Sequence, residues 1–455
     1  MGMWQRLTGK IKSSQSNRVV IFGLDGAPYT LLQRFMKEGV MPNLTQIVGE
    51  GTFSQMDTSI PEISSVAWTT FFTGVNPAKH GIYGFMDLKP NSYEMYFPNS
   101  NHVRTKTLWD ILGDYGKRSV IVNVPSTYPA KPLNGILISG FVALDLSKAT
   151  YPSTLLPMLE RANYQLDVDA TTAGESLEKF SENLVSALDA REKVLWHLLV
   201  NEPWDLFVGV ITETDRMHHY LWVAIEDPRH PFHDFFKSFY MRVDRFLGKV
   251  YEYFRGKGVF MLMSDHGFCH IQKEVYLNNW LISEGYLRFS TRNPRSYEDL
   301  GKESKAFNMD PARIYLHLKS KYPYGSVSPG EEYNTIREEL KTKLLGLKVN
   351  EAPVIQKVIF KEEIYHGPFL DAAPDIVLVP HWGFDLKGTI TKENLIGNSL
   401  LTGMHTQSDS TFFINVKTGT PEHINQRLNI MNITPTVLKA MNIKTEGRFD
   451  AASVI

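Results

Sequence analysis

An aspartate and a histidine stand next to each other directly after a strand-like run near the middle of the chain. Asp265 and His266 follow the apolar run 258–263, whose composition is typical of a strand buried on both faces. Open α/β sheets bind ligands at the carboxyl ends of their strands, and a carboxylate and an imidazole are costly to bury without partners. Both side chains bind divalent metals, so this pair predicts a metal site.

Other strand-like runs end in the same types of side chain. Asp25 closes a β-branched run and is followed by Gly26, which allows close approach of the backbone. Asp215 and His219 follow the run 205–212, and if the chain becomes helical there, the two side chains lie on one helix face. Each of these segments therefore adds candidate ligands at the carboxyl edge of a sheet.

One further histidine, His405, stands in a turn just before the strand-like run 410–415. With it, the candidate ligands are three aspartates and three histidines. This set suffices for two divalent ions of the zinc or manganese type, each with three protein ligands and an open position. Two metals about 4 Å apart suit in-line displacement at phosphorus, so we expect chemistry on a phosphate ester.

The motifs stand in the order seen in the alkaline phosphatase superfamily. More narrowly, the chain resembles the type I phosphodiesterase/nucleotide pyrophosphatase branch and its prokaryotic relatives described as predicted phosphohydrolases or phosphomutases. The resemblance spans nearly the whole chain, from about Val19 to about Arg448, and rests on Asp25-Gly26, Ser64 through His80-Gly81-Ile82, Asp215 with His219, Asp265-His266-Gly267 and His405, together with residues 107–110, 123–129, 276–281 and 373–375. It implies that one metal is held by Asp215, His219 and His405, and the other by Asp25, Asp265 and His266.

The same resemblance points to a serine nucleophile. The family's threonine or serine corresponds to Ser64 within the segment 61–74, with Ser65 as the alternative. The position suits the chemistry, because Ser64 lies where an extended segment is expected to become a helix, whose free N–H groups and dipole favour a phosphoryl group. A metal ion next to the Ser64 hydroxyl would lower the pKa of that hydroxyl, which predicts a phosphoserine intermediate.

Two departures from family patterns bear on the substrate. Nucleotide pyrophosphatases carry an asparagine three residues after the nucleophile, which helps hold the phosphoryl oxygens, and this chain has Ala67 there. This difference argues against taking nucleotide diesters as the substrates by default. The sulfatase signature has proline and arginine two and four residues after the nucleophile, but this chain has Val66 and Trp68, which argues against sulfate ester hydrolysis.

We therefore expect a metal-dependent phosphohydrolase, either a phosphodiesterase or a phosphatase, that cleaves a small-molecule phosphate ester through phosphoserine. A phosphomutase with a capped site, which returns the phosphoryl group to the same substrate, is the alternative among enzymes. A non-catalytic protein that binds a phosphoryl ligand is the alternative outside them, although the complete ligand set argues against it. The sequence leaves open the natural substrate, the choice between zinc and manganese, and the oligomeric state.

The overall composition is that of a globular enzyme without a strong net charge. The 455 residues include 48 basic and 49 acidic side chains, so no overall field draws the protein to nucleic acid, and we expect no obligate nucleic acid partner. The single cysteine, Cys269, fits a reducing compartment. No apolar run reaches the length of a membrane span, so we expect a cytoplasmic enzyme without a transmembrane segment.

Strand-like runs alternate with amphipathic helical patterns, which predicts a three-layer α/β/α sandwich with a mostly parallel central sheet. Strands are expected at residues 19–25, 119–124, 135–140, 205–212, 258–264, 375–380 and 410–415, and helices at 31–50, 181–200 and 235–254. Residues 18–284 and 371–455 are expected to form the catalytic core, and residues 285–370 a small α+β insert that caps the site. Residues 1–17 are expected to be a flexible lead-in, whose basic amphipathic pattern could contact a membrane surface.

Overall fold

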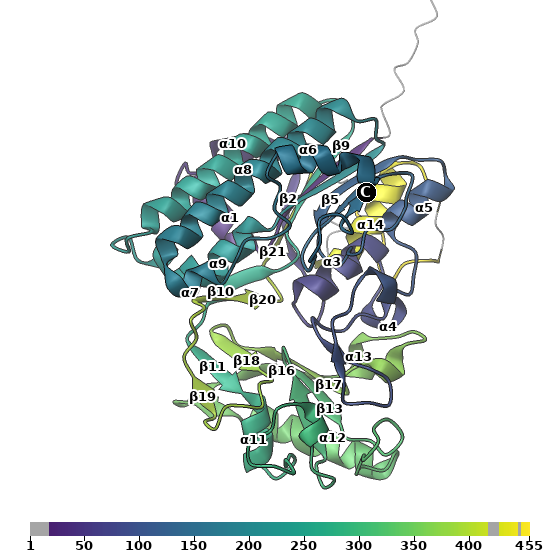
Figure 1. The fold of residues 1–455 in the computed structure, drawn as a ribbon, viewed down its shortest axis with the longest axis vertical. Helices are drawn as coiled ribbons and strands as arrows, with labels where there is room; N and C mark the ends of the chain where they lie inside the picture. The colour runs from purple at the N-terminus through teal and green to yellow at the C-terminus, as the bar shows by residue number, and fades with distance from the viewer. Residues whose placement is uncertain (1–17, 417–426, 445–446) are drawn as a thin grey trace, which may run out of the picture.

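The computed structural model describes residues 18–416, 427–444 and 447–455. Figure 1 shows a larger part, in which a sheet lies between helices, and a smaller part below it with sheets of its own. This arrangement confirms the expected three-layer α/β/α fold with a mostly parallel sheet. The expected lead-in, residues 1–17, lies outside the described residues. Within the described part of the chain, no helix is both long enough and apolar enough to cross a bilayer.

The central sheet of the described chain has the strand order β22-β2-β21-β9-β1-β8-β5-β6-β7. Its strands are β1 (Val19–Leu24), β2 (Thr52–Asp57), β5 (Ser119–Val124), β6 (Gly135–Ser139), β7 (Thr150–Tyr151), β8 (Leu206–Ile211), β9 (Val259–Met263), β21 (Ser410–Ile414) and β22 (Leu428–Asn429). β1 pairs in parallel with β8 and β9, and β5 pairs in parallel with β6 and β8. The neighbouring strands β8, β1 and β9 therefore end at one edge of the sheet.

Helices cover both faces of this sheet because its central strands are apolar on both faces. Along β1, Phe22 packs into one hydrophobic cluster and Ile21 into the other, as the two-residue period of a strand requires. The Phe22 face is covered by α1 (Tyr29–Lys37), α2 (Pro42–Val48), α8 (Leu177–Asn201), α9 (Glu213–Glu226) and α10 (His233–Phe254). The Ile21 face is covered by α3 (Ser64–Thr73), α5 (Leu108–Asp114) and α14 (Ile433–Ala440).

The smaller part contains the sheets β12-β13-β17-β16 and β18-β11-β19. Its elements are β11 (Lys273–Tyr276), β12 (Ala306–Met309), β13 (Arg313–Leu316), β16 (Ile355–Phe360), β17 (Ile376–Pro380), β18 (Phe384–Lys387), β19 (Ile396–Gly397), α11 (Leu277–Ser283) and α12 (Glu331–Leu345). One hydrophobic cluster joins them and includes Val275, Ile314 and Leu386, so the smaller part extends beyond residues 285–370 at both ends. An ion pair between Arg313 and Asp87 ties it to the larger part.

Short elements complete the described chain. They are α4 (Pro77–His80), α6 (Leu156–Arg161), α7 (Thr172–Glu175), α13 (Lys361–Ile364), β3 (Asp87–Leu88), β4 (Met95–Tyr96), β10 (Gly267–His270), β14 (Lys348–Val349), β15 (Ala352–Pro353) and β20 (Gly403–Thr406). Of these, β10 and β20 matter most for the site, because they form a separate two-stranded sheet beside the end of β9.

Three expectations about single elements are wrong. His405, expected in a turn, lies on the strand β20. The helix expected over residues 31–50 is two helices, because Gly39, with a positive φ of 74°, ends the first, and Pro42 opens the second. The strand expected at residues 375–380 forms as β17, but it pairs antiparallel with β13 and β16 of the smaller part instead of joining the central sheet. Its apolar run is buried in either location, so the sequence pattern alone did not distinguish them.

Candidate active site

Three neighbouring parallel strands bring the candidate ligands to one edge of the central sheet. Asp25 directly follows β1, and Asp265 and His266 follow β9. The chain after β8 turns into α9, which carries Asp215 and His219 in its first two turns. β1 lies between β8 and β9, so the three segments meet at the topological position where open α/β sheets bind ligands.

His405 reaches the same place from the two-stranded sheet. It lies on β20, opposite Phe268 of β10, and β10 continues the segment that carries Asp265 and His266. The His405 ring stacks on the His266 ring with 3.6 Å between centroids. A histidine far along the chain is thus placed over the end of β9.

The structure groups the six candidate ligands into two sets of three. In the first set, Nε2 of His405 lies 3.2 Å from Oδ1 of Asp215 and 3.1 Å from Nε2 of His219. In the second set, Nε2 of His266 lies 3.2 Å from Oδ2 of Asp265 and 3.7 Å from Oδ1 of Asp25. Within each set, the possible ligand atoms all lie within 4.8 Å of one another. The two sets are the same ones that the sequence resemblance implies.

The three histidines present the same nitrogen to the centre of the site. Their Nδ1 atoms lie 2.9–3.1 Å from the backbone carbonyls of Gly403, Gly267 and Glu62, for His219, His266 and His405 respectively. A hydrogen bond from Nδ1–H to a carbonyl leaves the Nε2 lone pair free and fixes the orientation of the ring. Such histidines are prepared as ligands through Nε2.

The arrangement of these atoms fits divalent cations. Oδ2 of Asp265 is buried and has no hydrogen-bond partner among the described residues. The Nε2 atoms of His219 and His405 face each other at 3.1 Å, although both rings are held through Nδ1. Acceptors that converge in this way need a cation or an added proton between them.

Burial and crowding set the charges of the site. Burial, together with the charges of Asp265 and Asp215, raises the pKa of Asp25 well above its usual value. Burial also lowers the pKa of His219 to about 4, so its ring is neutral near pH 7, the form that binds metals. Three carboxylates in one buried site favour positive charge, and two divalent cations would supply it.

Ser64 lies at the first position of α3 and points into the second set. Its Oγ is 3.1 Å from Nε2 of His266 and 3.5 Å from Oδ1 of Asp25. Ile63, at the N-cap of α3, makes no side-chain hydrogen bond to the first turn, so this helix end lacks the usual internal cap. Oγ of Ser65 instead donates to the carbonyl of Gly84, away from the ligand sets. Of the two candidate serines, Ser64 is therefore the one whose hydroxyl lies next to a ligand set.

Two supporting residues were not identified from the sequence as parts of the site. Nε1 of Trp68, one turn after Ser64 on α3, donates to Oδ2 of Asp25 at 3.0 Å. Nη1 of Arg216 donates to Oδ2 of Asp215 at 2.8 Å, while its other nitrogens bond to Asp167. The only sequence signal was position, because each residue stands next to, or one helical turn from, a candidate site residue.

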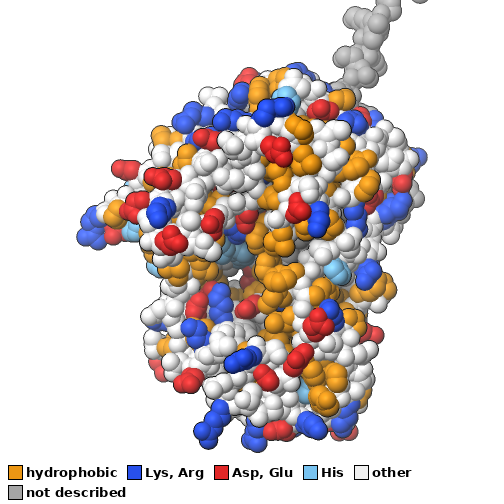
Figure 2. All heavy atoms as spheres, in the orientation of Figure 1, with side chains coloured by type: hydrophobic (Ala, Val, Ile, Leu, Met, Phe, Trp, Pro, Cys, Tyr) orange, Lys and Arg blue, Asp and Glu red, His pale blue; other side chains and the backbone are white. Residues whose placement is uncertain are grey.

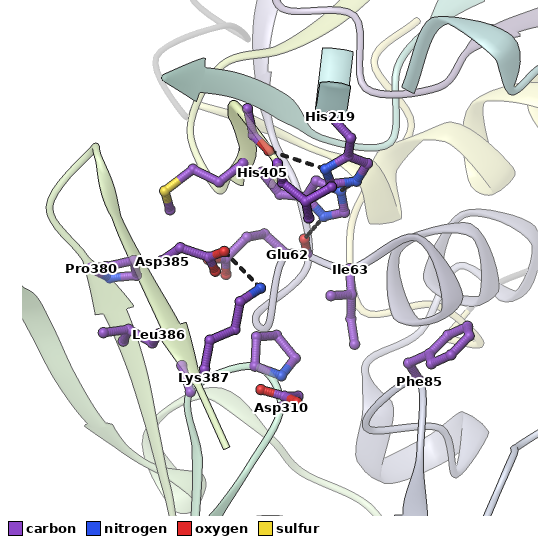
Figure 3. A pocket seen from close by; sticks show the side chains of 15 residues that line it. Glu62, Ile63, Phe85, His219, Asp310, Pro380, Asp385, Leu386, Lys387 and His405 are labelled. Carbon is purple, nitrogen blue, oxygen red and sulfur yellow. Dashed lines mark hydrogen bonds and ion pairs between the residues drawn. The ribbon is translucent and has the colours of Figure 1, made fainter. Parts of the chain in front are cut away.

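A cavity of about 240 Å³ opens beside the first ligand set, between the two parts of the molecule. His219, His405, Glu62 and Ile63 line it from the larger part, and Asp310, Asp385 and Lys387 line it from the smaller part (Figure 3). The space-filling view also shows the surface hollowed between the two parts (Figure 2). The smaller part thus forms one wall of this cavity.

Known proteins resemble the chain over most of its length. A family model for type I phosphodiesterase / nucleotide pyrophosphatase matches residues 19–408. Phosphonoacetate hydrolase from Sinorhizobium meliloti, solved in complex with phosphonoacetate, has a TM-score of 0.63 at 18% identity, over 94% of this chain and 96% of that one. Murine ectonucleotide pyrophosphatase / phosphodiesterase 5 has a TM-score of 0.54 at 14% identity, over 94% of this chain and 95% of that one. The human counterpart has a TM-score of 0.55 at 14% identity, over 94% and 96%.

At these identities the solved structures establish a shared fold, and the family model establishes membership. No curated protein sequence matches the chain. The matched residues include every candidate ligand and the candidate nucleophile, since all of them lie between Asp25 and His405. The chain therefore belongs to the type I phosphodiesterase / nucleotide pyrophosphatase family of the alkaline phosphatase superfamily and is a phosphoric ester hydrolase.

Proposed function

We propose that this protein cleaves a small-molecule phosphate ester by transferring the phosphoryl group to Ser64. The observation that carries the proposal is the position of the Ser64 hydroxyl. It lies at an uncapped helix N-terminus and within 3.5 Å of both His266 and Asp25. A hydroxyl in that position can attack phosphorus while the helix end receives the phosphoryl oxygens.

Two divalent cations, zinc or manganese, complete the proposed site. Asp215, His219 and His405 would hold one, and Asp25, Asp265 and His266 the other, with the Ser64 hydroxyl as a further ligand. When bound, these cations would lower the pKa of the Ser64 hydroxyl and offset the negative charge of the phosphoryl group.

Residues of the chain would carry out the remaining steps of the reaction. The N–H groups of the first turn of α3 orient the phosphoryl oxygens. The Ser64 oxygen forms a bond to phosphorus as the ester P–O bond breaks, and the alcohol leaves with a proton. Water then breaks the phosphoserine bond and releases phosphate or a phosphate monoester. The opening between the two parts gives water access to the site, which supports hydrolysis over a closed mutase reaction (Figure 2).

The smaller part serves as the cap of this enzyme in our proposal. Residues 285–370 form its centre, and the strands β11, β17 and β18 outside that range pack with it. Because the cavity is lined by Asp310 and by β18, the cap would choose the group attached to the phosphate. The single cysteine, Cys269, and the net charge of −1 support a cytoplasmic enzyme that does not need nucleic acid.

The test is hydrolysis of p-nitrophenyl phosphate and bis(p-nitrophenyl) phosphate by protein loaded with zinc or manganese. We expect release of p-nitrophenol from at least one ester. After a rapid acid quench, mass spectrometry should find a phosphoryl group on the peptide that contains Ser64. Ser64→Ala should lose turnover and the modified peptide, and Ser65→Ala should keep both. Turnover by Ser64→Ala at the rate of the unmodified protein would contradict the proposed nucleophile.

A further inference from the structure

The cavity between the two parts is placed to receive the group that leaves the phosphorus. It begins at His219 and His405 of the first ligand set and at Ile63, the residue before the proposed nucleophile. It then extends toward the smaller part, as far as Asp310 and Lys387 (Figure 3). An ester bound with its phosphorus at Ser64 would therefore place one substituent in this cavity.

More carboxyl groups than ammonium groups line the cavity. Three carboxylates line it, those of Glu62, Asp310 and Asp385, against the single ammonium group of Lys387. That ammonium is already paired, because Nζ of Lys387 lies 2.6 Å from Oδ2 of Asp385 (Figure 3). Burial opposes the charge of Lys387, but Asp385 and Asp310 outweigh it and raise the pKa of Lys387. Lys387 is thus paired with its own neighbours and is not free to bind a substrate anion.

Glu62 is the carboxylate with an unpaired buried oxygen. The residue is 7% exposed, and its Oε2 has no hydrogen-bond partner among the described residues. Its backbone carbonyl accepts from Nδ1 of His405, which holds this segment against the first ligand set. A buried carboxylate oxygen without a donor is costly, and a bound group that supplies a donor and a positive charge removes that cost.

The rest of the lining is apolar and suits a short alkyl chain. Ile63, Phe85, Leu401 and Met404 also line the cavity. A group that suits this mixed lining combines a few methylenes with a hydrogen-bond donor. A hydroxyl group would offer Glu62 only a donor, whereas an ammonium group offers both a donor and a positive charge.

We infer that the cavity selects phosphate esters of amino alcohols, with the ammonium group of the leaving alcohol bound by Glu62 and the neighbouring carboxylates. The inference rests on the proposed hydrolase function and adds the substrate class to it. The same charges exclude alcohols that carry a carboxylate or a phosphate, because such a group would meet Glu62 and Asp310 with Lys387 already paired.

The test compares three esters that differ in one terminal group. Phosphate esters of ethanolamine, ethylene glycol and glycolate present an ammonium, a hydroxyl and a carboxylate at the same distance from phosphorus. Each is offered to the metal-loaded protein as a monoester and as the methyl diester, and release of the free alcohol is measured. We expect kcat/KM to fall in the order ammonium, hydroxyl, carboxylate, with about tenfold or more between the first and the last.

Two variants assign the selectivity to named residues. Glu62→Gln keeps the shape of the side chain but removes the carboxylate. The ratio of kcat/KM for the ammonium ester to kcat/KM for the hydroxyl ester should therefore fall toward one. Asp385→Asn frees the Lys387 ammonium, so kcat/KM for the carboxylate ester should rise relative to kcat/KM for the ammonium ester. Glu338→Gln, at an exposed position of α12, should keep the selectivity of the unmodified protein. Calorimetry with Ser64→Ala protein should show tighter binding of phosphoethanolamine than of phosphoglycolate, without any turnover.

The outcomes separate this inference from the function on which it rests. Equal rates for the three esters, or a preference for the carboxylate, would overturn the inference and leave the hydrolase function intact. The same holds if Glu62→Gln keeps the full preference for the ammonium ester, or if bis(p-nitrophenyl) phosphate is cleaved and none of the three esters is. No turnover of any ester, including bis(p-nitrophenyl) phosphate, would overturn the proposed function and the inference with it.

Discussion

The indole of Trp68 donates a hydrogen bond to Oδ2 of Asp25, and this bond joins the helix of the proposed nucleophile to a candidate metal ligand. Ser64 and Trp68 lie one turn apart on α3, and Oδ1 of the same aspartate lies 3.5 Å from the Ser64 hydroxyl. The Asp25 carboxylate is thus bonded to α3 through Trp68, and its other oxygen lies next to the Ser64 hydroxyl of the same helix. A tilt of α3 would move the Ser64 hydroxyl and the Asp25 carboxylate together, so the distance between them would change little.

Removing this bond should weaken the site without unfolding the protein. Trp68→Phe keeps an aromatic ring in the buried position but deletes the donor, so Asp25 can rotate. We expect activity and metal affinity to fall by about 10-fold or more, the range found when hydrogen-bond partners of metal ligands are removed. Activity assays and metal titration measure both quantities.

Trp109→Phe is the matched control for that change. Trp109 packs in the same hydrophobic cluster, next to Phe72, and none of its ring atoms is bonded to a candidate ligand. The control should keep its metal affinity even if it loses some stability. An equal loss of metal affinity in both variants would mean that packing, and not the Trp68 bond, holds Asp25.

Five of the six candidate ligands could be located from the sequence because each follows a strongly patterned strand, whereas His405 lies on β20. Asp25 follows a strand that is buried along its whole length, and Asp265 follows one that is buried from its second residue on. The parallel pairing of β1 with β9 brings their ends together. The family resemblance added Ser64, whose type and local pattern alone would fit an ordinary helix start. The roles assigned to these residues stay predictions.

What could not be predicted depends on contacts between distant segments. The strand at 375–380 is apolar enough for either sheet, and its location follows from partners on β13 and β16 that no local pattern reveals. Trp68 looks like a core residue in the sequence, and most of its ring does pack in the hydrophobic core. Its Nε1 atom reaches Asp25 only because β1 passes beside α3. The cavity likewise arises where β18 approaches Glu62, more than 300 residues away along the chain.

Gly23 allows that approach of Trp68. A Cβ atom at this position would lie 2.4 Å from Cη2 of Trp68, so the indole would have to move. We expect Gly23→Ala to reduce activity by about as much as Trp68→Phe, because it displaces the same donor, and to lower stability by a further ~1–3 kcal/mol through overpacking. Gly113→Ala is the control, since a Cβ there meets nothing within 4 Å. Full activity of Gly23→Ala would show that the Trp68 bond is dispensable.

Asp265→Asn should separate the two metal sites. The change removes one of the two carboxylates of the second ligand set and leaves Asp215, His219 and His405 intact. We expect elemental analysis to find one equivalent of metal less than in the unmodified protein, together with loss of most activity. Asp244→Asn alters another buried aspartate, one that accepts from the backbone at the start of α2, and should keep the full metal content. Unchanged metal content in Asp265→Asn would remove this residue from the ligand set.

The cap should lose stability in acid through Asp375. This buried carboxylate accepts from Lys361, Tyr333 and the backbone of Leu316 at 2.7–2.9 Å. Burial opposes its charge, but the nearby lysines outweigh burial, so the pKa of Asp375 is lowered below its usual value. A pKa lower in the folded than in the unfolded chain stabilises the fold above the unfolded value, about 3.9, and this contribution disappears as the pH falls through the folded value.

Urea unfolding at pH 7 and at pH 3 measures this contribution. Asp375→Asn should lower the free energy of unfolding at pH 7 by about 3 kcal/mol, because it leaves the Lys361 ammonium without its buried partner. At pH 3 the difference from the unmodified protein should shrink, since the aspartate is then protonated in a growing share of molecules. Asp371→Asn, at an exposed position nearby, should change the free energy little at either pH. A difference that stays constant from pH 7 to pH 3 would show that Asp375 acts through its shape and hydrogen bonds and not through its charge.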